Sequence, residues 1–121
     1  AGAKKQAAKS THSNVVKYIS AELQKCNLGE ANAMGTKLSC SAVTQTNIIN
    51  AATATDGPFA DFKNPYKTAD AAVRSGSDTS KGGYVNIVAN GTDKLDIATC
   101  FTVDGECGTA SNVLKKTITI E

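Results

Sequence analysis

The chain has 121 residues, of which 40% are hydrophobic and 20% charged, with a formal net charge of +2 at pH 7. This length suits one domain with a single hydrophobic core, and the many Gly, Ser, Thr, Asn and Ala residues are more typical of a loop-rich secreted protein than of a dense enzyme core. No apolar run approaches the roughly 20 residues that span a bilayer, and no stretch has the pattern of a signal peptide. The sequence as given therefore predicts a soluble chain.

A single long helix is predicted from Ala1 to Cys26. Apart from Gly2 this stretch has no Gly or Pro, and most of its residues favour helices. The first half, Ala1 to Asn14, has no large hydrophobe, so we expect it to project from the domain or to meet another molecule. Asn27 and Gly29 are typical of a helix end. Apolar residues recur at helical spacing in the second half and form one stripe, which consists of Val15, Val16, Ile19, Leu23 and Cys26. We expect Leu23 to be the main anchor of this stripe.

Positive charge is concentrated in this helix. The first 25 residues contain five lysines and one glutamate, a net charge of +4, whereas the remainder has eight basic and ten acidic residues, a net charge of −2. Only Tyr18 lies among these lysines as an aromatic residue, so the pattern is not typical of a nucleic-acid site. The lysines either form a solvated helix face or contact the acidic body of a neighbouring copy, in which case the contact residues would be Lys4, Lys5 and Lys9.

Four cysteines allow three different disulfide pairings. Their spacing favours two local pairs, Cys26 with Cys40 at the end of the helix and Cys100 with Cys107 around a short loop. Neither separation matches the knuckle spacing of a zinc site, so we expect no metal here. Disulfides indicate an oxidising compartment, and each would contribute roughly 2 to 3 kcal/mol in the chain-entropy model.

The middle of the chain, residues 27–83, is expected to connect the helix to a sheet. A short helix is predicted from Ser41 to Ala54, where the apolar residues have roughly helical spacing. From Pro58 to Gly83, Gly and Pro residues indicate a long surface connection. We expect three aromatic side chains to pack this connection against the domain, those of Phe59, Phe62 and Tyr66. A connection of this length in a small domain usually carries a function or a binding edge.

Residues 84–121 are expected to form an antiparallel sheet. The runs Tyr84 to Ala89 and Lys94 to Val103 are rich in β-formers, and the Asn90-Gly91-Thr92-Asp93 segment between them is a strong hairpin signal. A further strand is predicted from Val113 to Ile120. A long helix followed by these strands predicts one α+β domain over the whole chain, with the helix packed on an antiparallel sheet of three to four strands.

No catalytic centre is evident. The single histidine, His12, has no nucleophile and carboxylate in a pattern that would pair with it, so we expect a surface histidine. Ser80-Lys81-Gly82-Gly83 lacks the spacing of a phosphate loop, and Asn90-Gly91-Thr92 matches a glycosylation pattern that the turn already explains. We expect neither enzyme activity nor a cofactor. Four acidic residues could form a calcium site at one end of the sheet, namely Asp93, Asp96, Asp104 and Glu106. Their spacing in the sequence does not match a known calcium-binding motif.

The order of a long helix, a glycine-punctuated connection and a sheet with late cysteines resembles the soluble head domain of type IV pilins. The resemblance covers nearly the whole chain and implies the αβ-roll of that family. Family members begin with an apolar segment of about 25 residues, which has no counterpart in the sequence given. The parts that carry the resemblance are the helix from Ala3 to Lys25, Asn64-Pro65-Tyr66, the run from Tyr84 to Ala89, and Cys100 with Cys107.

This resemblance implies a structural subunit of a bacterial type IV pilus. Such a protein has an inner-membrane, periplasm-facing precursor and polymerises with other pilin subunits into an extracellular filament used for adhesion, motility or DNA uptake. Its membrane contact is through the apolar segment, and its outer surface can bind host or surface ligands. Two alternatives remain open: a pseudopilin of a type II secretion system, which shares this plan, and an unrelated secreted binding module stabilised by disulfides.

Overall fold

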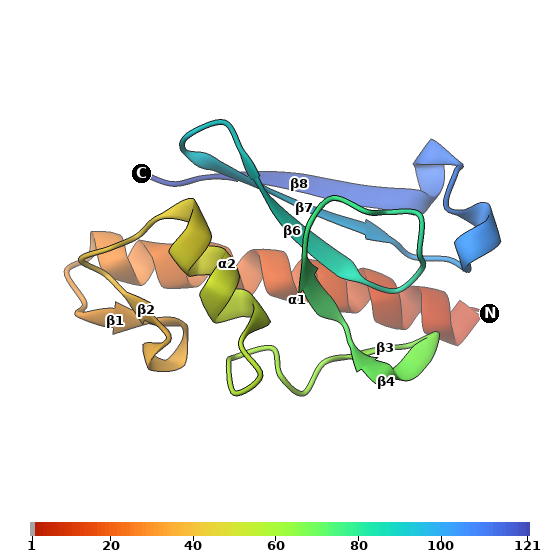
Figure 1. Ribbon diagram of the computed structural model, residues 1–121, viewed down its shortest axis with the longest axis horizontal. Coiled ribbons are helices and arrows are strands. Elements are labelled where there is room, and N and C mark those ends of the chain that lie inside the picture. The colour runs from red at the N-terminus through yellow and green to blue at the C-terminus, as the bar shows by residue number, and fades with distance from the viewer. Residues whose placement is uncertain (1) are drawn as a thin grey trace.

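Helix α1 (Gly2–Asn27) is the longest element and runs along the length of the molecule (Figure 1). The computed structural model describes residues 2–121, and Ala1 lies outside the described residues. The helix ends in a Schellman motif, in which the Glu30 N–H donates to the Lys25 carbonyl and the Gly29 N–H to the Cys26 carbonyl. Gly29 has the left-handed φ of +97° that this motif requires, so the predicted helix end is confirmed.

Short elements follow α1. The strands β1 (Asn32–Ala33) and β2 (Leu38–Ser39) pair antiparallel around the 3-10 turn η1 (Met34–Thr36). Helix α2 (Gln45–Thr53) begins later than predicted, because the Thr44 side chain caps it by accepting from the Asn47 N–H.

A four-stranded sheet covers α1 along one side (Figure 1). Its order is β5 (Val73–Ser75), β6 (Val85–Asn90), β7 (Lys94–Cys100) and β8 (Val113–Thr119). The pairs β6–β7 and β7–β8 are antiparallel, and the predicted hairpin around Gly91 joins β6 to β7. The predicted α+β fold is therefore confirmed.

The sheet differs from the prediction in its first strand. β5 pairs with β6 in parallel, with Val73 opposite Val85, so the sheet is mostly rather than wholly antiparallel. The stretch Pro58 to Gly83, predicted to be a surface connection, also contains the strands β3 (Lys63–Asn64) and β4 (Lys67–Ala71), which pair antiparallel. β3 has only two residues, and all five residues of β4 are exposed, so neither strand has the alternating pattern of a half-buried strand.

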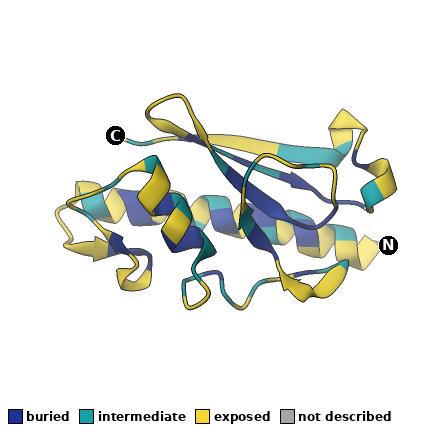
Figure 2. Ribbon diagram, viewed as in Figure 1, coloured by how far each residue is buried: buried dark blue, intermediate teal, exposed yellow. Residues whose placement is uncertain are grey.

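The hydrophobic core lies between the two helices and the sheet. α1 contributes Val15, Ile19 and Leu23, while Ile48 of α2 and the alternate residues Leu95 and Ile97 of β7 meet them. Figure 2 shows that buried residues recur along α1. Val15 and Ile19 have no exposed surface, and Leu23, the predicted main anchor, is also buried but remains 8% exposed.

The first half of α1 is more buried than predicted. Ala8 is 1% exposed and His12 is 6% exposed, although neither is a large hydrophobe. The sequence interpretation was wrong here because a small side chain lets a helix approach a sheet closely, and this close approach buries surface without large apolar groups. Within this half, residues 2–7 are mostly exposed.

Candidate functional site

The three lysines predicted to contact neighbouring subunits differ in exposure and surroundings. Lys4 is exposed, whereas Lys5 and Lys9 are half-buried. Lys4 and Lys5 are adjacent in α1 and therefore point about 100° apart around the helix axis. The Lys9 ammonium lies 4.4 Å from the centre of the Phe101 ring, a cation–π contact within the chain. Lys4 and Lys5 are thus the better candidates for contacts with another molecule.

Both predicted disulfides are present. Cys26 and Cys40 are joined with a Cα–Cα distance of 5.0 Å, and Cys100 and Cys107 with one of 5.6 Å. The first ties the end of α1 to the segment after β2. The second closes the loop that contains the 3-10 turn η2 (Asp104–Glu106). These bonds are typical of proteins in an oxidising compartment.

His12 is a buried polar residue at the interface between α1 and the sheet, not the surface histidine that the sequence predicts. Its Nδ1 atom lies 2.8 Å from the Thr99 Oγ1 atom of β7. Burial lowers the pKa of the imidazole below its ordinary value of 6.5, because the charged form loses hydration. The sequence carried one signal of this burial, since His12 precedes Val15 and Ile19 at helical spacing.

A groove runs between α1 and β8 beside His12. Four residues of α1 line it, namely His12, Ser13, Val16 and Lys17, and residues 114–116 of β8 form the opposite wall. Its volume is about 260 Å³. We call this feature the α1–β8 groove.

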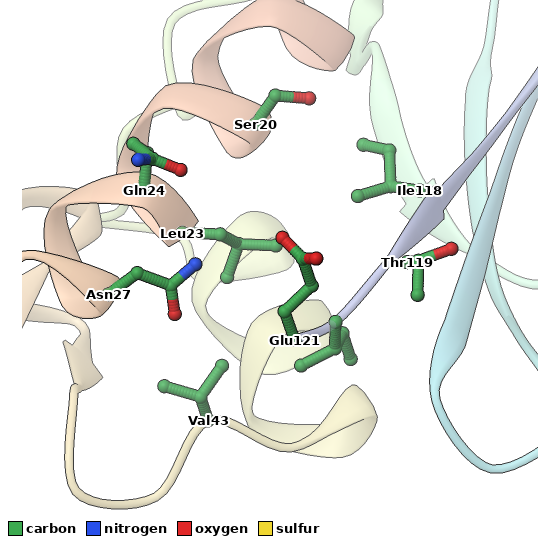
Figure 3. A pocket seen from close by; sticks show the side chains of 9 residues that line it. Ser20, Leu23, Gln24, Asn27, Val43, Ile118, Thr119 and Glu121 are labelled. Atoms are coloured by element: carbon green, nitrogen blue, oxygen red, sulfur yellow. The ribbon is translucent and has the colours of Figure 1, made fainter.

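A second hollow of about 180 Å³ lies further along the same two elements (Figure 3). Leu23 and Gln24 of α1 border it, and the end of β8 with the two residues after it forms its other side. Figure 3 shows the Glu121 side chain pointing toward α1 beside Leu23. Because both hollows follow the line where β8 meets α1, the helix is incompletely covered along this border.

The two walls of the α1–β8 groove differ from the rest of the surface in charge. From Gly2 to Ala21, α1 contains lysines and no Asp or Glu, and β8 contains Lys115 and Lys116 and likewise no Asp or Glu. One carboxylate lies near the β8 lysines, that of Asp96, which is 3.5 Å from the Lys115 ammonium. The groove is therefore a basic region with an apolar floor.

The acidic residues considered for calcium are engaged with protein donors. The Asp96 carboxylate accepts a hydrogen bond from the Thr117 hydroxyl, which is the main reason that its pKa is lowered. The Asp104 carboxylate accepts from the Gly82 N–H, and this bond likewise lowers its pKa. Within residues 2–121, no three His, Cys, Asp or Glu side chains are placed to hold a metal ion together.

Glu22 is a structural residue that the sequence did not reveal. It is 6% exposed, and its carboxylate accepts from the Met34 N–H at 2.7 Å and pairs with the Lys25 ammonium at 2.9 Å. Met34 and Thr36 have positive φ angles of 52° and 89°, a conformation unfavourable for residues other than glycine. Glu22 thus fixes a strained turn to α1 through a charged hydrogen bond.

Comparisons with protein families, with curated proteins and with solved structures found no match to this chain. Among residues 2–121, the structure has no helix with the length and apolar character needed to cross a bilayer.

Proposed function

We propose that this protein is a structural subunit of an extracellular filament of the type IV pilus class. The observation that carries this proposal is the geometry of α1, whose 26 residues form one helix about 39 Å long. Its first residues are mostly exposed at one pole of the molecule (Figure 2). An apolar helix joined ahead of Gly2 would continue this axis away from the body, which is the arrangement that subunits need to pack their helices in a filament core.

The two disulfides and the basic first turns of α1 support this proposal. Disulfides suit a subunit that matures in the periplasm and works outside the cell. In a filament, Lys4 and Lys5 would face acidic residues of neighbouring subunits. Each exposed pair would contribute only about 0–1 kcal/mol, but the contact repeats along the filament.

The experiment is to join an apolar helical segment of about 25 residues to Gly2 in continuous helical register and to express the fusion with a type IV pilus assembly system. We expect filaments by electron microscopy that react with an antibody to this domain. A fusion that folds and reaches the inner membrane but yields no filaments would overturn the proposal.

Lys4 and Lys5 are tested in the same fusion. We expect the double variant Lys4→Glu/Lys5→Glu to lower filament yield at low salt while the melting temperature of the isolated domain stays the same. The matched control is Lys63→Glu/Lys81→Glu, which makes the same charge change at exposed lysines outside α1. Equal filament yields from the two variants would contradict the assigned contact.

A pseudopilin would share the geometry of α1, so the assembly machinery separates the two assignments. Assembly by type II secretion components and not by the pilus system would favour a pseudopilin. A secreted binding module is favoured by a different observation, the basic α1–β8 groove, and would need no polymer.

A further inference from the structure

β8 forms one edge of the sheet. Its hydrogen-bonded neighbour in the described chain is β7, so the opposite side of β8 presents backbone N–H and C=O groups to a possible added strand. Lys115 and Lys116 are both exposed on this strand. Lysines on an edge oppose pairing with an identical strand, because like charges would lie opposite one another. The edge is therefore suited to a strand of opposite charge.

Two of the three lysines that line the groove beside this edge have no paired carboxylate among residues 2–121. Lys115 pairs with Asp96, but Lys17 and Lys116 have no ion-pair partner within residues 2–121. Lys116 lies opposite Ile97 in the register, so its side chain projects from the face of the sheet on which α1 packs. Lys17 and Lys116 thus line the groove from its two walls.

The floor of the groove offers apolar contacts and one ring nitrogen. Val16 and Leu114 are half-buried and line it. His12 uses its Nδ1 atom in the contact with Thr99, which leaves Nε2 as the ring nitrogen available to a ligand. A volume of about 260 Å³ suits a few side chains rather than a large cofactor.

We propose that the edge of β8 and the α1–β8 groove bind an extended acidic segment of a partner protein. The segment adds to the sheet as a strand beside β8, which is a known mode of peptide recognition. Its carboxylates meet Lys17 and Lys116, and an apolar side chain contacts Val16 and Leu114. This inference does not depend on whether the chain forms filaments.

A protein segment fits these features better than a nucleic acid does. Nucleic acid bound as a single strand commonly stacks its bases on exposed aromatic side chains. Among residues 2–121, no Phe, Tyr or Trp lines the groove, and the ring of His12 is buried. The free edge of a strand presents both N–H donors and C=O acceptors. An extended peptide has the same two groups and can pair with them, whereas a phosphate backbone has acceptors but no donors.

The test measures binding of a fluorescent ten-residue peptide of alternating Glu and Val to the full chain at low salt. We expect saturable binding, with NMR shifts in the β8 amides and in the His12 ring. Three probes define the mode: a Lys/Val peptide, the Glu/Val peptide with alternate amides N-methylated to remove strand pairing, and a single-stranded oligonucleotide of equal charge. We expect all three to bind at least tenfold more weakly.

Variants then locate the site. Lys17→Glu/Lys116→Glu should weaken Glu/Val peptide binding at least tenfold, whereas the matched control Lys63→Glu/Lys81→Glu should change it less than twofold. Both variants should keep the native circular dichroism spectrum and melting temperature, since all four lysines are exposed. Absence of peptide binding, equal binding of the oligonucleotide or the N-methylated peptide, or equal loss in both variants would overturn the proposal.

Discussion

The two halves of α1 are held against the sheet by different physical means. From Val15 onward the helix buries large apolar side chains, and their removal from water supplies the stabilisation. Before Val15, the helix is held by the small Ala8, by the hydrogen bond of His12 to Thr99 and by the contact of Lys9 with Phe101. A helix segment without large hydrophobes can therefore still be buried, but its attachment depends on close fit and on the protonation state of His12.

The largest effect is expected in the second half. Changing Ile19 to Ala should lower the free energy of unfolding by about 2–5 kcal/mol, because the fully buried side chain leaves a cavity. Leu23→Ala should cost less, since Leu23 borders an open hollow that water can enter. Urea unfolding of both variants measures the difference. An equal or larger loss for Leu23→Ala would show that the anchor lies nearer the end of the helix.

An intermediate effect is expected in the first half, where fit rather than apolar area is the controlling factor. Ala8→Leu should lower the free energy of unfolding by about 1–3 kcal/mol, because the larger side chain pushes α1 away from the sheet. Ala7→Leu is the matched control, since Ala7 is exposed, and should change stability by less than about 0.5 kcal/mol. If both variants unfold at the same urea concentration, the first half is not closely packed.

The smallest effect is a pH dependence due to His12. Burial lowers the pKa of His12 in the folded state, so the unfolded chain binds a proton first as the pH falls below about 6.5. Stability from this group is therefore complete above pH 6.5 and declines as the pH falls toward the folded-state pKa. We expect the melting temperature to decrease between pH 7.5 and 5.5.

His12→Gln should flatten this dependence, because its amide can still bond to Thr99 but does not titrate. Four aspartates have lowered pKa values, namely Asp56, Asp78, Asp96 and Asp104. They lose their charge below the pH range measured, so they do not contribute to the difference between the two proteins. An identical slope in the variant would assign the pH dependence to other groups.

Local patterns were sufficient to predict much of the fold. The apolar spacing and Gly29 located α1 and its end, the Asn90-Gly91 turn located the β6–β7 hairpin, and cysteine spacing gave both disulfides. β5 could not be predicted, because a strand of three residues has no readable period and its partner is chosen by the surrounding packing.

The candidate site was only partly predictable. The basic charge of α1 is visible in the sequence, but the groove depends on how closely α1 approaches β8. The burial of His12 also depends on Thr99, which lies 87 residues away in the chain. Contacts at such a separation leave no local pattern, and the sequence therefore indicated an exposed first half of α1. The predicted subunit contacts at Lys4, Lys5 and Lys9 stay predictions.

The pairing of His12 with Thr99 also has a consequence for folding in the cell. A ribosome makes α1 before it makes the strands that cover it, β7 and β8. The apolar stripe of α1 is therefore covered completely only after β7 and β8 have been synthesised. Contacts between residues so far apart in the chain slow folding, because a long loop must close before they form.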